Sequence, residues 1–199
     1  MRGISGGLRR RATWITAAGL AALGCGPRQP APVTSPTTLA PARVLPLNRV
    51  LVLETSGPAP SDTSVTFTAG TPRIIVLRHG PPENIVFARL NFPATAFADS
   101  GQQVTVEVRP RPGVYGLDIS TSLPVRGGAT LVFDYARFFS APVRARQVYR
   151  SDVAFERALA VGRILPDHQI ELLPSTRPVL DNVGATIPAS GSYLIAAPQ

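Results

Sequence analysis

The chain contains no lysine, because all twenty of its basic residues are arginine. Lysine forms Schiff bases, acts as the base of a Ser–Lys dyad and contacts the phosphates in a phosphate-binding loop. These three chemistries are therefore excluded within these 199 residues.

Cysteine and histidine are almost as scarce. The single cysteine, Cys25, leaves no internal disulfide and no cysteine pair for zinc. The two histidines, His79 and His168, are far apart in the sequence and each lies among turn residues, as in His79-Gly80-Pro81. Because no Gly-x-Ser-x-Gly elbow is present, we interpret both as surface histidines in turns and expect no catalytic, cofactor or metal site. A hydrolase that uses His79 or His168 is kept as an alternative.

The net charge of +8 overstates how basic the folded part is. Four arginines and no acidic residue precede Cys25, so loss of that segment leaves 8 − 4 = +4. The other arginines are scattered among acidic residues, whereas nucleic-acid-binding proteins gather their positive charge in one stripe. We therefore expect no nucleic-acid partner.

The sequence has no apolar run long enough for a membrane-spanning helix near its start. Residues 12–23 form an apolar run of about a dozen residues, whereas about 20 are needed to span a bilayer. Arg9, Arg10 and Arg11 precede this run and small residues follow it, which is typical of an export signal. The pattern predicts a signal peptide over residues 1–24.

The residues Ala22-Leu23-Gly24-Cys25 resemble the lipobox of bacterial lipoproteins, in which a diacylglycerol is added to the cysteine and the chain is cut just before it. Gly24 matches the pattern, but Ala22 replaces the usual leucine, which leaves the cleavage position less closely defined. The resemblance implies a lipidated Cys25 and a membrane anchor without a spanning helix. In proteobacterial lipoproteins, an aspartate directly after the cysteine resembles an inner-membrane retention signal. This chain has Gly26 at that position, which favours the outer membrane of the cell envelope.

A proline-rich linker is predicted for residues 25–47. Proline at this density favours extended, polyproline-like chain. The six prolines are Pro27, Pro30, Pro32, Pro36, Pro41 and Pro46. We interpret this segment as a spacer between the lipid and a folded domain over residues 48–199.

Short apolar runs separated by Gly, Pro, Asn and Asp predict an all-β domain with two packed sheets. Val104, Val106 and Val108 alternate with polar residues, as in a strand with one buried face. The run 73–78 is apolar on both faces and is predicted to be a central strand. Residues 156–162 are the one candidate for a short helix. The predicted strands are 49–54, 64–68, 73–78, 84–92, 102–109, 129–135, 146–154, 159–165, 169–173, 183–187 and 192–196.

Part of the domain resembles the ZU-five domain, an immunoglobulin-like β-sandwich. The resemblance spans roughly residues 60–199 and departs from the pattern at Thr95, where glycine is usual. It implies protein–protein interaction rather than catalysis. Relatives that cleave themselves do so at His-Phe-Ser, and Phe138-Phe139-Ser140 lacks that histidine. The segments that match the domain are Asn91-Phe92-Pro93-Ala94-Thr95-Ala96-Phe97, residues 104–108, Gly116-Leu117 and Leu131-Val132-Phe133-Asp134-Tyr135. The stretches 148–150, 170–176 and 191–195 are similar to the segment that often follows this domain in bacteria.

Tyr135, Phe138, Phe139 and Tyr193 are the candidate binding residues. They could form an exposed stacking platform for sugars, but alternating core residues of a sandwich are the favoured interpretation. The sequence as a whole predicts a membrane-anchored lipoprotein with a non-catalytic interaction module whose partner is another envelope protein. A carbohydrate-binding envelope lipoprotein is the main alternative.

Overall fold

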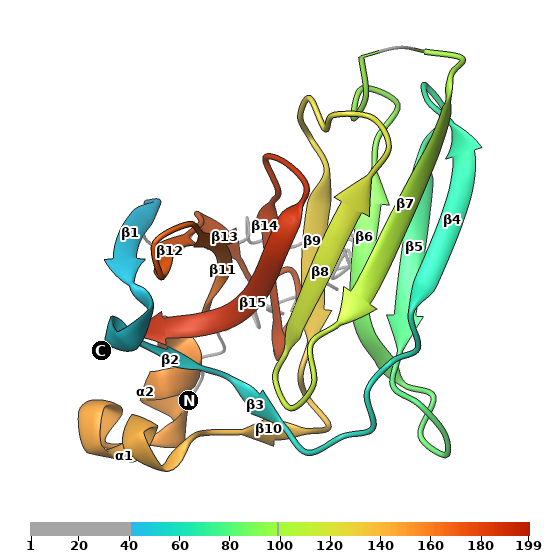
Figure 1. The fold of residues 1–199 in the computed structure, drawn as a ribbon. Helices are drawn as coiled ribbons and strands as arrows, with labels where there is room; N and C mark the ends of the chain where they lie inside the picture. Colours follow the sequence, from blue (N-terminus) through green and yellow to red (C-terminus); the bar gives the residue numbers. More distant parts are fainter. Residues whose placement is uncertain (1–40, 99) are drawn as a thin grey trace, which may run out of the picture. The chain divides into compact units, whose positions relative to one another are not determined.

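The fold is given by a computed structural model, which describes residues 41–98 and 100–199. The predicted export signal, Cys25 and most of the predicted linker lie outside the described residues. The described part is an all-β sandwich of two antiparallel sheets with two short helices, as the sequence predicts (Figure 1).

The larger sheet has the order β1-β12-β11-β15-β8-β7-β4, and β2 pairs with β15 outside this path. All of its pairings are antiparallel, so each strand presents alternate residues to its two faces. Its strands are β1 (Arg43–Pro46), β2 (Val50–Val52), β4 (Thr63–Thr68), β7 (Gln103–Pro110), β8 (Gly116–Thr121), β11 (Ala160–Leu165), β12 (Gln169–Leu172) and β15 (Gly191–Pro198).

The smaller sheet has the order β13-β14-β9-β6-β5. Its strands are β13 (Ser175–Thr176), β14 (Asn182–Thr186), β9 (Thr130–Asp134), β6 (Val86–Phe92) and β5 (Arg73–Arg78). A separate pair joins β3 (Glu54–Thr55) to β10 (Phe139–Ser140), and one 3-10 turn (Leu47–Arg49) precedes β2.

The core lies between the two sheets and contains most of the aromatic residues. Val104, Val106 and Val108 of β7 are fully buried, which confirms the alternation predicted for that strand. Phe87 stacks on Tyr115 with ring centroids 5.2 Å apart. Burial of large apolar side chains on the inner faces of both sheets is the main force that closes the sandwich.

The predicted strand over 146–154 is wrong. This stretch is part of a helical hairpin, α1 (Val143–Tyr149) and α2 (Asp152–Ala158), and α2 overlaps the predicted helix 156–162 only at its end. The hydroxyl of Ser151 accepts a hydrogen bond from the Ala154 amide and so caps α2. The Arg146 guanidinium also donates to the Asp152 carboxylate, which favours the turn between the helices.

The domain begins earlier than the predicted residue 48. Strand β1 pairs Arg43–Pro46 with Gln169–Leu172, so these residues of the predicted linker belong to the sheet. Strand β8 was not among the predicted strands. Pro112 and Gly113 precede β8, and Gly116 is its first residue. These turn-type residues hide the period of the strand from the sequence pattern.

Strand β5 is an edge strand, not the central strand that its sequence predicts. It pairs only with β6, and it ends the smaller sheet. Ile75 and Leu77 face the core, whereas Ile74 and Val76 face outward and are 61% and 43% exposed. The second apolar face of β5 is therefore exposed, whereas a central strand would have both of its faces buried.

Candidate functional site

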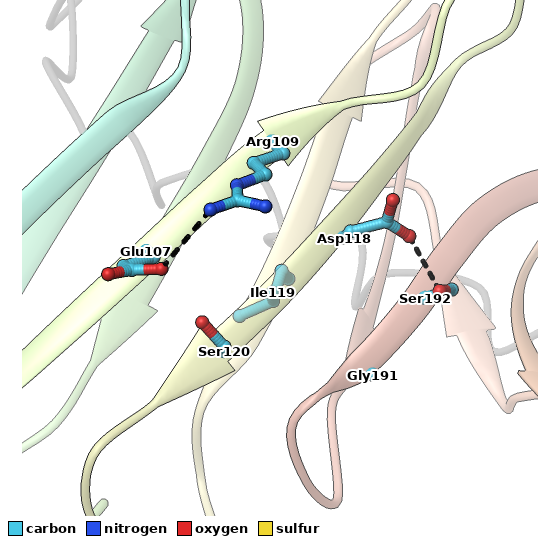
Figure 2. A pocket seen from close by; sticks show the side chains of 7 residues that line it. All are labelled: Glu107, Arg109, Asp118, Ile119, Ser120, Gly191 and Ser192. Carbon is cyan, nitrogen blue, oxygen red and sulfur yellow. Dashed lines mark hydrogen bonds and ion pairs between the residues drawn. The ribbon is translucent and has the colours of Figure 1, made fainter.

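A polar hollow lies on the outer face of the larger sheet, where β7, β8 and β15 are adjacent. Strand register places Arg109 beside Asp118, and Asp118 beside Ser192. Glu107 and Ser120 form the next cross-strand pair along the same face. The hollow measures about 300 Å³ and has these five side chains in its lining (Figure 2).

Asp118 is the centre of the polar contacts in this hollow. Its Oδ1 accepts a hydrogen bond from Ser192 Oγ at 2.6 Å and from Arg111 Nη1 at 2.8 Å (Figure 2 shows the first of these). Within the described residues, no hydrogen bond reaches Asp118 Oδ2. This second oxygen therefore remains available as an acceptor for a bound molecule.

A second hollow, of about 450 Å³, adjoins the first and shares Asp118 with it. Its lining is more apolar and includes Val52, Ile164 and Leu194. These side chains belong to a small second hydrophobic cluster on this face of the sheet. The two hollows together offer a polar part and an apolar part.

The carboxylates of this face are paired with arginines. The hollow holds two carboxylates, and each has an arginine partner, since Arg109 lies 3.8 Å from Glu107 and Arg111 lies 2.8 Å from Asp118. Within residues 41–98 and 100–199, no histidine lines either hollow, so this part of the chain gives neither serine of the site a nearby imidazole base. The groups present can donate and accept hydrogen bonds to a partner molecule.

His79 is buried, not exposed in a turn as predicted. It is 1% exposed, and its ring packs against Phe87 and Phe138 with centroids 5.1 and 4.7 Å away. Its Nδ1 lies 2.9 Å from the Pro58 carbonyl oxygen, and Nε2 has no partner within the described part. Aromatic rings therefore surround this histidine, and among the described residues no serine or carboxylate is hydrogen-bonded to it.

His168 is in a surface turn, as predicted. It lies between β11 and β12 with a backbone φ of 56°, and its side chain is exposed beside Asp167 and Asn48. No hydrogen bond among the described residues joins its ring to a serine or a carboxylate. The structure therefore places His79 and His168 in different surroundings and assembles no triad around either.

The four predicted aromatic residues do not form an exposed platform. Tyr135 and Tyr193 are 1% and 0% exposed, and Phe138 and Phe139 are half-buried against the same core. The Tyr193 hydroxyl donates to the Ala189 carbonyl, and burial raises the pKa of this phenol. The favoured interpretation, in which these residues alternate into a sandwich core, accounts for both tyrosines.

Among residues 41–98 and 100–199, no cluster of three or more His, Cys, Asp or Glu side chains could hold a metal ion. In the same part of the chain, no helix has the length and apolar character needed to cross a membrane. Cys25 lies outside it.

Comparison with known proteins returned no match: no family model, no curated protein and no solved structure is similar to this chain. The function must therefore be argued from the chain's own residues.

The sequence pattern did not identify Asp118 and Ser192 as neighbours. The alternation in β7 does predict that Glu107 and Arg109 face solvent. Strand β8 was not predicted. Its pairing with β7 and β15, which creates the hollow, could therefore not be predicted either.

Proposed function

We propose that this protein is a lipoprotein of the cell envelope, anchored through a lipid on Cys25, whose β-sandwich binds another envelope protein and has no catalytic activity. The observation that carries the proposal is the order of features along the chain. A positively charged start, a short apolar run, the lipobox-like Ala22-Leu23-Gly24-Cys25 and a proline-rich linker precede one folded domain.

The non-catalytic part of the proposal is supported by the contents of the domain. His79 is enclosed by aromatic rings, and the carboxylates of the Asp118 hollow are paired with arginines. The open hollows instead carry side chains suited to contact with a protein partner. The relation to the ZU-five domain stays a prediction from sequence.

The carbohydrate-binding alternative depended on exposed aromatic side chains. Sugar-binding proteins commonly stack a sugar ring on an exposed aromatic face, and Tyr135 and Tyr193 are enclosed in the core. We therefore do not propose it.

Cross-linking in living cells followed by affinity purification from solubilised membranes tests the proposal. We expect a defined envelope protein to be recovered with the full chain and to be strongly reduced with Cys25→Ala, which cannot be lipidated. A preparation that yields no protein above an untagged control, in repeated experiments, contradicts the interaction function.

A further inference from the structure

The free edge of β5 carries two exposed apolar side chains, whereas the edge strand β1 of the larger sheet carries one, Val44. Every second residue of an edge strand turns its N–H and C=O groups away from the sheet, where another strand can pair with them. Ile74 and Val76 add two exposed β-branched side chains to this edge. The neighbouring edge strand β4 is exposed at Ser64 and Thr66 instead, so its outer surface is polar.

The edge of β5 is also accessible. Strands β4 and β5 lie side by side but belong to different sheets, and no backbone ladder joins them (Figure 1). A hollow of about 240 Å³ opens beside the end of β5, between Val76 and Arg78 on one side and Pro60 and Thr63 on the other. A further chain can therefore approach β5 without displacing a described element.

The positive charge of β5 limits which strands can pair with its free edge. Arg73 and Arg78 stand at the two ends of β5, and neither has an ion-pair partner within the described part of the chain. The strand contains no acidic residue. A second copy of this chain would bring two more arginines to the same edge, which disfavours self-pairing. A strand with an acidic residue near each end would instead pair with both arginines.

We infer that β5 is the docking edge for an extended segment of the partner protein, with apolar residues in its middle and an acidic residue at each end. The partner segment adds a strand to the smaller sheet, and its side chains contact Ile74 and Val76. This inference rests on the proposed function and names the chemistry of its partner. Strand β5 also lies at the opposite side of the sandwich from β1, the first strand of the described part (Figure 1).

The test uses the full-length protein purified in detergent and a labelled synthetic peptide of alternating threonine and valine with a glutamate at each end. Fluorescence anisotropy measures binding, and hydrogen exchange with mass spectrometry locates it. We expect saturable binding and slower amide exchange over residues 73–78. A scrambled peptide with adjacent central glutamates, and a peptide with alternate backbone nitrogens methylated, should both bind at least about tenfold more weakly.

The double variant Arg73→Glu/Arg78→Glu should weaken binding of the acidic peptide at least about tenfold and bind a peptide with arginine at each end. Arg49→Glu/Arg157→Glu changes the net charge equally at exposed positions away from β5 and should leave binding unchanged. Circular dichroism checks that both variants are folded. The inference is overturned if the acidic peptide does not bind, if methylation has no effect, or if both double variants weaken binding equally.

The outcome also separates this inference from the proposed function. If cross-linking recovers the same partner with the native chain and with Arg73→Glu/Arg78→Glu, the partner binds elsewhere, so the β5 inference fails and the interaction function stands. If the peptide binds β5 as described but no partner is recovered, the edge chemistry stands and the proposed function fails.

Discussion

The Tyr135 hydroxyl donates a hydrogen bond to Glu156 Oε1 over 3.1 Å and so joins the end of the smaller sheet to helix α2. Arg177 completes the contact, because its guanidinium donates both to the Tyr135 hydroxyl and to the Glu156 carbonyl. Three segments that are distant in sequence are thereby held together: the residue after β9, the helical hairpin and the loop before β14.

Tyr135→Phe is expected to lower the free energy of unfolding by about 1–2 kcal/mol, since it leaves the Glu156 carboxylate and Arg177 without the hydroxyl that joins them. Urea denaturation measures the change. Glu156→Gln is the matched control, because its side-chain carbonyl can still accept the phenol's hydrogen bond and its effect should be smaller. Equal stability of Tyr135→Phe and the native chain would show that the contact contributes nothing.

The turn between helices α1 and α2 gives a second prediction. Ser151→Ala removes the hydroxyl that caps α2 and should destabilise the protein by about 1 kcal/mol. Ser151→Asp keeps a capping oxygen and should be close to the native stability. If alanine and aspartate at this position give the same urea midpoint as serine, α2 does not begin at Ser151.

All four tyrosines should titrate abnormally. Burial raises the pKa of Tyr115 to about 12, and it also raises the pKa of Tyr135, Tyr149 and Tyr193. In the unfolded chain a phenol ionises near pH 10. Between about pH 10 and 12 the unfolded state therefore holds fewer protons than the folded state, so stability is lost as the pH rises through this window.

Absorbance of the tyrosinate band, followed together with circular dichroism, measures this effect. We expect ionisation above pH 10 to coincide with loss of the β-sheet signal. Normal, reversible ionisation of all four phenols near pH 10 in a protein that keeps its fold would contradict the burial of these side chains.

Two buried tyrosines offer an internal comparison. The Tyr115 hydroxyl lies near the Thr55 side chain and the Phe138 backbone, but in the described part of the chain neither contact reaches hydrogen-bond geometry. The Tyr193 hydroxyl, in contrast, donates to the Ala189 carbonyl. Tyr115→Phe should therefore leave the stability unchanged or raise it slightly. Tyr193→Phe should lower it by about 1 kcal/mol. Urea midpoints of the two variants compare them directly, and the opposite order would mean that the hydroxyl environments are assigned wrongly.

Most of the sandwich could be predicted because its strands carry local signals. Val104, Val106 and Val108 alternate with polar residues, and turn residues separate the apolar runs. The prediction of a strand over 146–154 was wrong because Val148 and Val153 suit a strand as well as the exposed side of a short helix. The deciding contacts, the Ser151 cap and the Arg146–Asp152 pair, depend on three-dimensional geometry.

The candidate sites were harder to predict, because burial and strand order are tertiary properties. The Gly80-Pro81 turn beside His79 indicates exposure, but Phe87, Tyr115 and Phe138 come from other segments to cover its ring. Strand β5 has apolar residues on both faces. A central strand and an edge strand with exposed apolar side chains show this same sequence pattern. Strand order, which decides between them, is not encoded within six residues.

The central claim is that Cys25 carries the lipid that holds the domain at a membrane. Mass spectrometry of the N-terminal peptide from membrane-purified protein tests it most directly. The account predicts a chain that begins at Cys25 and carries a diacylglyceryl group. A chain recovered from the soluble fraction with residues 1–24 still attached and Cys25 unmodified would contradict it.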